Sequence, residues 1–169
     1  MIDHLDHLVL TTAHPKACIA FYTEVLGMRL ETFGAGRKAF CFGAQKINLH
    51  LKGHEFEPKA HVPMPGALDL CFIVNQPLEA VMARLAACNV PIAEGPVPRT
   101  GATGPIRSVY VRDPDLNLIE LAVQVSASGL PVSPAPSLGR AIAARRTPHP
   151  PNVHHFGSFV IDAAAIPDL

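Results

Sequence analysis

The chain lacks an excess of either charge. Its 14 lysines and arginines balance 14 aspartates and glutamates among 169 residues, and only 17% of the residues are charged. A balanced chain has no general electrostatic attraction for nucleic acid or anionic membranes, so we expect neither as a partner. Hydrophobic residues make up 49% of the chain, which excludes disorder throughout and suffices for one buried core.

Long hydrophobic runs, a leader segment and paired cysteines are also missing. No apolar run approaches the ~18 residues that a membrane span needs, and the N-terminus has no basic segment of a signal peptide. The four cysteines show no CxxC spacing, so we expect buried free thiols rather than disulfides. These absences favour a soluble cytoplasmic protein.

Residues 1–53 predict one β-α-β-β-β unit. A strand over 6–10 is followed by a helix that Pro15 opens and Gly27 ends, since proline fits a first helical turn and glycine the position after the last. The apolar residues of this helix share one face. Three further strands are predicted at 28–33, 38–42 and 47–51.

The same order returns after a connector rich in proline and glycine at 58–66. A strand over 68–74 precedes a helix that begins at Pro77. Asn89 takes the place of the terminating glycine, and asparagine is the next best residue for a left-handed cap. The second half of the chain therefore repeats the architecture of the first.

The repeat has a steady offset of 62 residues, which grows to 72 at the last strand because a Gly/Pro-rich loop is predicted at 95–105. Such a duplication predicts an α+β fold of two βαβββ modules that form a pair of half-barrels. The modules span about 2–53 and 66–125. No GxGxxG motif or P-loop follows a strand, and two helices are too few for a doubly wound sheet.

Ionisable residues occupy predicted strand positions where apolar ones are expected. Glu120 has apolar neighbours on its strand face, and a carboxylate in such surroundings is costly unless it is compensated. The repeat makes His7 equivalent to Asp69, and Asn48 equivalent to Glu120. Near two-fold symmetry would gather these positions around one axis, where histidine and carboxylates could bind a divalent metal. Taken singly, each could instead be a satisfied core or surface residue.

Three segments resemble the vicinal-oxygen-chelate superfamily, which includes glyoxalase I, extradiol dioxygenases and bleomycin resistance proteins. They are DHLVL at 6–10, FYTEVLGM at 21–28 and RDPDLNLIEL at 112–121. Within the superfamily, QKINLH at 45–50 and EFEPKAH at 55–61 are most similar to the glyoxalase domain-containing protein 5-like branch. Leu116 departs from the pattern, because it replaces the glycine common in the Asp-Pro-Asp turn.

The resemblance implies a metal held by strand residues of both modules, often in a homodimer. His7 matches the first-strand histidine and Glu120 the last-strand glutamate. Asp69 stands where glyoxalase I and the extradiol dioxygenases have histidine, and Asn48 where glyoxalase I has glutamate. His50, two residues further on, is then the stronger ligand of that strand. The candidate metal ligands are therefore His7, His50, Asp69 and Glu120.

The resemblance also implies the chemistry. The metal would chelate neighbouring substrate oxygens and stabilise an enolate or oxyanion, and Glu120 is the candidate catalytic residue that moves the proton. A set of His7, Asp69 and Glu120 favours Mn, Zn, Ni or Mg. If His50 binds in place of Asp69, two histidines and one carboxylate would admit Fe.

Several cations and polar side chains could contact an anionic substrate. Carboxylates and phosphates are bound by such groups, although each charge taken alone could be a solvated surface residue. The candidate substrate-binding residues are Arg37, Lys46, Asn48, Arg99 and Tyr110.

Three functions remain open from the sequence. One is a metal-dependent lyase or isomerase, with glyoxalase-like chemistry on a small anionic substrate. The second is an extradiol-type ring-cleaving dioxygenase. The third is a metal-free small-molecule binding or resistance protein, against which the four candidate ligands count.

Residues 126–169 have no counterpart in the repeat. They hold seven of the 17 prolines, so we expect a Pro-rich extension that is partly disordered or docks on a partner. A short helix is predicted at 138–146, and the apolar segment 156–161 could dock. The histidines of this region, His149, His154 and His155, are expected to be incidental.

Overall fold

The computed structural model describes residues 1–126, whose elements follow the predicted order. The elements of the first module are β1 (His7–Thr12), α1 (Pro15–Ala20), η1 (Phe21–Val25), β2 (Arg29–Phe33), β3 (Arg37–Phe42) and β4 (Gln45–Leu51). Those of the second are β5 (Asp69–Ile73), α2 (Leu78–Ala87), β6 (Glu94–Gly101), β7 (Gly104–Arg112) and β8 (Leu118–Gln124).

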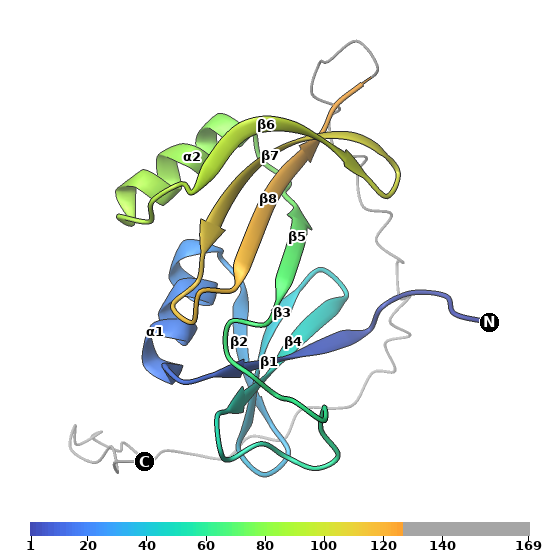
Figure 1. Cartoon of the computed structure of the whole chain (residues 1–169), viewed down its shortest axis with the longest axis vertical. Helices are drawn as coiled ribbons and strands as arrows, with labels where there is room; N and C mark the ends of the chain where they lie inside the picture. The colour runs from blue at the N-terminus through green and yellow to red at the C-terminus, as the bar shows by residue number, and fades with distance from the viewer. Residues whose placement is uncertain (127–169) are drawn as a thin grey trace, which may run out of the picture. The chain divides into compact units, whose positions relative to one another are not determined.

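The strands form two four-stranded sheets of one topology (Figure 1). Sheet A has the order β1-β4-β3-β2, and sheet B the order β5-β8-β7-β6. In each sheet the first strand of the module lies parallel to the last, so Val9 is beside Asn48 and Cys71 is beside Glu120. Two βαβββ modules are thus confirmed, and the predicted equivalence of Asn48 with Glu120 holds in the register. Neither sheet closes into a barrel.

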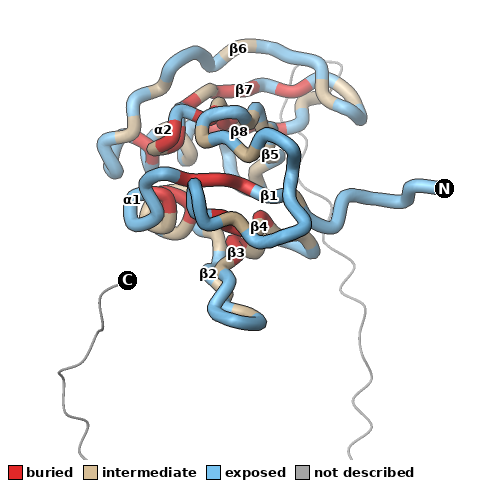
Figure 2. The backbone as a smooth tube through the Cα atoms, turned by 60° about the horizontal axis from the view of Figure 1, so that its bottom comes forward, coloured by how far each residue is buried: buried red, intermediate tan, exposed pale blue. Residues whose placement is uncertain are grey.

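One hydrophobic core joins the two modules. Both helices lie on the same side of the sheets (Figure 1). The core combines Leu10, Phe40 and Ile47 of sheet A with apolar residues of β7 and β8 in sheet B. Figure 2 accordingly shows β1, β7 and β8 with long buried stretches, whereas the edge strand β6 is mostly exposed.

Both helices end as the sequence predicts. Gly27 and Asn89 each follow a helix with a positive φ, of 75° and 56°. The first helix differs from the prediction in its second half, because η1 from Phe21 to Val25 is a π-helical turn and not α-helix. Its buried face is nevertheless the predicted one, with Phe21 and Tyr22 in the core.

The predicted loop at 95–105 is wrong, because most of it belongs to strand β6. Arg99 therefore lies on a strand and not on a loop. Proline is tolerated there because β6 is an edge strand and its register shifts between Glu94 and Val97, so fewer of its N–H groups are needed for pairing.

Hydrogen bonds of the turn between β7 and β8 tie the second module to the first. The buried carboxylate of Asp113 accepts a hydrogen bond from the Tyr22 hydroxyl at 3.0 Å. The Asp115 carboxylate accepts from the Thr12 hydroxyl, and from the Ala13 N–H at 2.9 Å. We call these three hydrogen bonds, with Asp113 and Asp115 as acceptors, the module clasp. Both carboxylates of the Asp-Pro-Asp segment thus have a structural role, because they accept hydrogen bonds from the first module.

Two further expectations concern the whole chain. The four cysteines are free thiols as predicted, but only Cys18 is buried, while Cys71 and Cys88 are exposed. Among residues 1–126, no helix has the length and apolar character needed to cross a membrane. The predictions for the Pro-rich extension, including the helix at 138–146, the docking segment 156–161 and the three histidines, lie outside the described residues.

Candidate functional site

Strand alternation places the predicted site residues on one face of each sheet, opposite the helices. Residues that are partners in register, or two apart on one strand, point to the same side. On sheet A this face, called site face A, carries Val9, Thr11 and the candidates His7, Arg37, Lys46, Asn48 and His50. On sheet B it is called site face B and carries Cys71, Ile73, Ser108 and the candidates Asp69, Tyr110 and Glu120.

Buried polar atoms without a hydrogen-bond partner occur on these two faces. Most buried polar groups in proteins are paired, so each exception marks a group available to something else. Among the described residues, the unpaired side-chain atoms are Asn48 Oδ1, His50 Nδ1, Ser108 Oγ and Glu120 Oε1. Two of them are candidate metal ligands, and Asn48 is a candidate substrate contact.

His7 is held in an orientation that suits a ligand. Its Nδ1 lies 2.6 Å from the Asp6 carboxylate, which leaves Nε2 free. A histidine that binds a metal usually has such a carboxylate on its other ring nitrogen. The bond with His7 also lowers the pKa of Asp6, so the partner stays ionised.

Two unpaired cations flank one aromatic ring on site face A. The Arg37 guanidinium lies 4.7 Å from the centre of the Phe33 ring, and the Lys46 ammonium lies 4.2 Å from it. Neither forms a salt bridge with a carboxylate of residues 1–126. Their charges are therefore available to an anion, as the sequence predicted for a substrate contact.

Glu120 is flanked by a thiol and a phenol on site face B. Cys71 is its register partner on β5, and Tyr110 its partner on β7. Desolvation and the Glu120 carboxylate raise the pKa of the Cys71 thiol to about 11, so this cysteine is neutral at physiological pH. Desolvation also raises the pKa of Tyr110. Both neighbours are therefore protonated and can donate hydrogen bonds.

Arg99 is engaged within sheet B. Its Nε donates to the Tyr110 hydroxyl at 3.0 Å, and its terminal nitrogens donate to Glu94 at 2.6 Å and to the Pro98 carbonyl at 3.0 Å. Unlike Arg37 and Lys46, it has a carboxylate partner already. Its position fixes the Tyr110 side chain beside Glu120.

The candidate ligands do not converge within one chain. Across residues 1–126, no three histidine, cysteine, aspartate or glutamate side chains lie close enough together to hold a metal ion. His7 and His50 belong to sheet A, whereas Asp69 and Glu120 belong to sheet B. Imidazole and carboxylate groups are suitable ligands for a divalent metal, and the unpaired Glu120 oxygen is available to bind one. Each sheet, however, provides only two of the four candidate ligands.

A connector over residues 52–68 covers part of site face A. The Glu55 carboxylate organises it by accepting from the Gly53 N–H at 2.8 Å and from the Lys59 ammonium at 3.1 Å. These bonds lower the pKa of Glu55 to about 2. Between the connector and sheet A lies a cavity of about 400 Å³, which we call the connector cavity. It is lined by Val9, Thr11, His50, Pro58, Lys59, Ala60, Val62, Pro63, Met64, Ala67 and Leu68.

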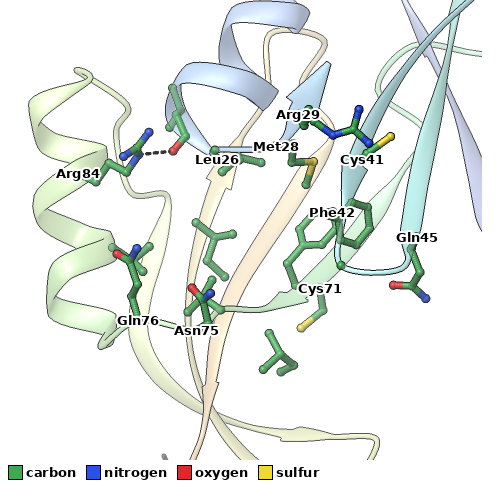
Figure 3. Close-up of a pocket in the computed structure, with 18 of the residues that line it drawn as sticks. Leu26, Met28, Arg29, Cys41, Phe42, Gln45, Cys71, Asn75, Gln76 and Arg84 are labelled. Atoms are coloured by element: carbon green, nitrogen blue, oxygen red, sulfur yellow. Dashed lines mark hydrogen bonds between the residues drawn. The ribbon is translucent and has the colours of Figure 1, made fainter. Parts of the chain in front are cut away.

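A larger cavity of about 910 Å³ lies between the β3–β4 turn, strand β5 and helix α2 (Figure 3). Its described lining includes Cys41 and Cys71 but no histidine, aspartate or glutamate. Arg84, at one side of it, donates to the Val25 carbonyl at 2.7 Å (Figure 3). This lining holds none of the candidate metal ligands and no carboxylate or imidazole to accept a proton, so we place the site on the two site faces.

Sequence reasoning missed several contributors to the site. The rings of Phe33 and Phe56 were not predicted, although Phe56 lies 5.6 Å from the His50 ring, centre to centre. Cys71 was missed as well. Its spacing of two residues from Asp69 predicts the same strand face, but a thiol next to the candidate carboxylates was not assigned to the site.

The fold agrees with the comparisons to known proteins. Residues 4–121 match the family model described as the Glyoxalase/Bleomycin resistance protein/Dioxygenase superfamily, and the chain belongs to that superfamily. The structural neighbours of lower identity share this fold. A lactoylglutathione lyase from Agrobacterium tumefaciens superposes with a TM-score of 0.57 at 22% identity, over 72% of this chain and 94% of that one. TnmS3, an antibiotic binding protein from Streptomyces sp. CB03234, gives 0.56 at 22% identity, over 78% and 98%.

Two relatives are much more similar in sequence. Virulence protein STM3117 from Salmonella typhimurium is 54% identical over 125 residues, which are 74% of this chain and 87% of the relative. Its crystal structure superposes with a TM-score of 0.71 at 55% identity, over 72% of this chain and 97% of that one. The glyoxalase domain-containing protein RDO1 from Mycosarcoma maydis is 57% identical over 121 residues, 72% of this chain and 68% of the relative.

Proposed function

We propose that the chain is a metal-dependent enzyme with lyase or isomerase chemistry on a small anionic substrate. The observation that carries the proposal is the buried Glu120 oxygen, which has no partner on site face B. A carboxylate oxygen in that position either binds a cation or accepts a proton. Membership of a superfamily that includes such enzymes supports the same function.

The proposed metal set is His7 and either His50 or Asp69, together with Glu120. Because the donors of sheet A and sheet B do not converge within residues 1–126, a second copy of the chain would complete the site. Exposed apolar side chains on the site faces, Val9 at 41% and Ile73 at 54%, support such a homodimer. Each copy would contribute two modules, which we propose to span about 2–53 and 66–125.

The proposed roles of the other residues follow from their contacts. A bound divalent cation would supply Lewis-acid stabilisation of a developing oxyanion. Glu120 accepts the proton from the substrate at its unpaired Oε1, while Tyr110, held by Arg99, donates a hydrogen bond. Arg37 and Lys46 bind the anionic group of the substrate, and Asn48 offers its unpaired Oδ1 to a substrate hydroxyl.

Metal analysis of protein purified without an affinity tag tests the proposal. We expect about one divalent ion per chain in the wild type, and loss of most of it in His7→Ala and in Glu120→Gln. His14→Ala and Glu79→Gln are matched controls, since both residues are exposed and lie off the site faces. Full metal content in both site variants would contradict the proposed ligands.

Metal-free binding of a small molecule is the second candidate. It is favoured by the lack of a three-donor cluster among residues 1–126. Protein that contains no divalent ion, and that takes up none when dialysed against Mn, Zn, Ni or Mg, would select this function over catalysis. Iron-dependent oxygen uptake with a catechol would instead select the extradiol dioxygenase.

A further inference from the structure

The connector cavity has one buried polar group that nothing in residues 1–126 satisfies. His50 is 7% exposed and lines the cavity, and its Nδ1 has no partner among the described residues. Leaving a buried donor or acceptor unpaired costs about 1–3 kcal/mol, so such a group is seldom retained without a use. His50 is therefore available to a hydrogen-bonding partner from outside residues 1–126.

The surroundings of His50 do not resemble those of a metal ligand. Its register partner on β1 is Thr11, and the ring of Phe56 packs against it edge to face at 5.6 Å. The Glu55 carboxylate interacts with His50 through its charge, but its hydrogen bonds go to Gly53 and Lys59. A histidine that binds a metal usually has an oriented partner on its second nitrogen, as His7 has in Asp6.

A cation without a carboxylate partner stands beside this corner. The Arg37 guanidinium lies 5.7 Å from the centre of the Phe56 ring, which packs against His50, and it forms no salt bridge with a carboxylate of residues 1–126. Lys59 is instead paired with Glu55 and Glu57. The His50 imidazole has at least one N–H donor in either protonation state. Most of the remaining cavity wall is aliphatic, from Val9 on the sheet to Leu68 at the end of the connector. Its volume of about 400 Å³ is within the usual range for small-molecule sites.

We propose that the connector cavity binds a small organic carboxylate, with its apolar body against the connector and its carboxylate hydrogen-bonded to His50. This inference rests on the proposed function in one respect only, because it takes the bound carboxylate to be the anionic group of the substrate, to which His50 adds a hydrogen bond beside the Arg37 charge. It assigns His50 to the substrate and leaves His7, Asp69 and Glu120 for the metal. Two histidines would then not share the metal, which disfavours the iron triad.

Benzoate is a suitable probe, because it combines a carboxylate with a compact apolar body. With full-length protein labelled with ¹⁵N at histidine, we expect benzoate to shift the ring nitrogens of His50. Acetate lacks the apolar body and benzyl alcohol lacks the charge, so each should bind at least about tenfold more weakly, which corresponds to ~1.4 kcal/mol. Equal affinity for all three probes would overturn the proposal.

Two variants separate the carboxylate contact from the cavity itself. His50→Ala should weaken benzoate at least about tenfold, as expected for the loss of a hydrogen bond to a charged group. Ala60→Phe should also abolish binding, because it fills the cavity from an exposed connector position without touching the core. His54→Ala is the control, since that histidine is exposed and lies outside the cavity lining.

Metal content of the same variants distinguishes this inference from the proposed function. If His50→Ala keeps its metal and loses benzoate, both stand. If His50→Ala loses the metal while benzoate leaves the His50 signals unshifted, His50 is a metal ligand and the inference fails alone. If wild-type protein binds benzoate through His50 but no metal, the inference stands and the proposed function fails.

Discussion

Leu116 has a backbone conformation that is unfavourable for a residue with a side chain. It has a φ of 69° in the turn between β7 and β8, and its side chain is 68% exposed. A left-handed conformation costs an L-residue roughly 1–2 kcal/mol, whereas glycine adopts it freely. Because glycine also loses about 0.5–1 kcal/mol in chain entropy on folding, Leu116→Gly should raise the free energy of unfolding by up to about 1 kcal/mol.

Urea denaturation followed by circular dichroism measures this difference. Leu51→Gly is a fair comparison, because Leu51 is 40% exposed at the end of β4, where extended backbone requires no glycine. That variant should be less stable than the wild type. A loss of stability in Leu116→Gly as well would contradict the idea of backbone strain at the turn.

Residues with a positive φ at the helix ends were predicted well from the sequence. Gly27 and Asn89 were predicted as helix-ending residues from their equivalent places in the repeat, and both have the left-handed conformation. Leu116 was recognised only because a related family has glycine there. Nothing in the physical properties of leucine would have predicted a φ of 69°.

The connector is an element whose order depends on one carboxylate. Bonds from Gly53 and Lys59 lower the pKa of Glu55 to about 2, against about 4.3 in an unfolded chain. A carboxyl group with a lowered folded-state pKa stabilises the fold above its unfolded pKa, and the contribution disappears as the pH falls towards the folded value. The stability that Glu55 adds should therefore be complete above about pH 5 and decline down to about pH 2.

Thermal denaturation of Glu55→Gln at several pH values checks this. Its Tm should be lower than that of the wild type at pH 7, and the two values should approach each other as the pH falls to about 2. Glu57→Gln is the matched control, because Glu57 also contacts Lys59 but is 74% exposed. A constant Tm difference between Glu55→Gln and the wild type over this pH range would contradict the linkage.

Strand β6 could not be predicted from local sequence. Its prolines, Pro96 and Pro98, lack the N–H groups that a strand normally uses, so the segment has the composition of a loop. It pairs with β7 on one side only, and its register shifts between Glu94 and Val97. Tertiary pairing therefore decides this element, and with it the position of Arg99.

At the scale of the whole molecule, the module clasp joins segments that lie far apart in sequence. Tyr22 is fully buried, and its hydroxyl donates to Asp113 at 3.0 Å. A hydrogen bond to a charged group contributes about 1.5–3 kcal/mol, so Tyr22→Phe should lower the free energy of unfolding by about that amount. Tyr110→Phe should change it by less than about 0.5 kcal/mol, because that hydroxyl is near the surface.

Denaturant titration of both variants tests the comparison. Equal stability of Tyr22→Phe and the wild type would show that the clasp adds nothing to folding. The sequence could not have predicted this contact, because the partner residues are about ninety positions apart. Only the packing of helix η1 against the β7–β8 turn brings them together.

Association of two copies is the other property of the whole molecule. Ile73 is 54% exposed at the edge strand β5, so Ile73→Lys should fold normally but dissociate the proposed homodimer and reduce its metal content. Leu30→Lys is the control, since Leu30 is also exposed but lies on the opposite face of its sheet. Sedimentation velocity checks the result, and a wild type that is monomeric at all concentrations would contradict the proposed assembly.

The two tyrosines have a practical consequence. The chain contains no tryptophan, so its intrinsic fluorescence comes from Tyr22 and Tyr110 alone. Tyr22 belongs to the clasp between the modules, whereas Tyr110 stands beside Glu120 on site face B. Tyr110→Phe therefore leaves a fluorophore that reports on unfolding, and Tyr22→Phe leaves one that reports on events at the site. Two conservative variants thus provide separate optical signals without an added label.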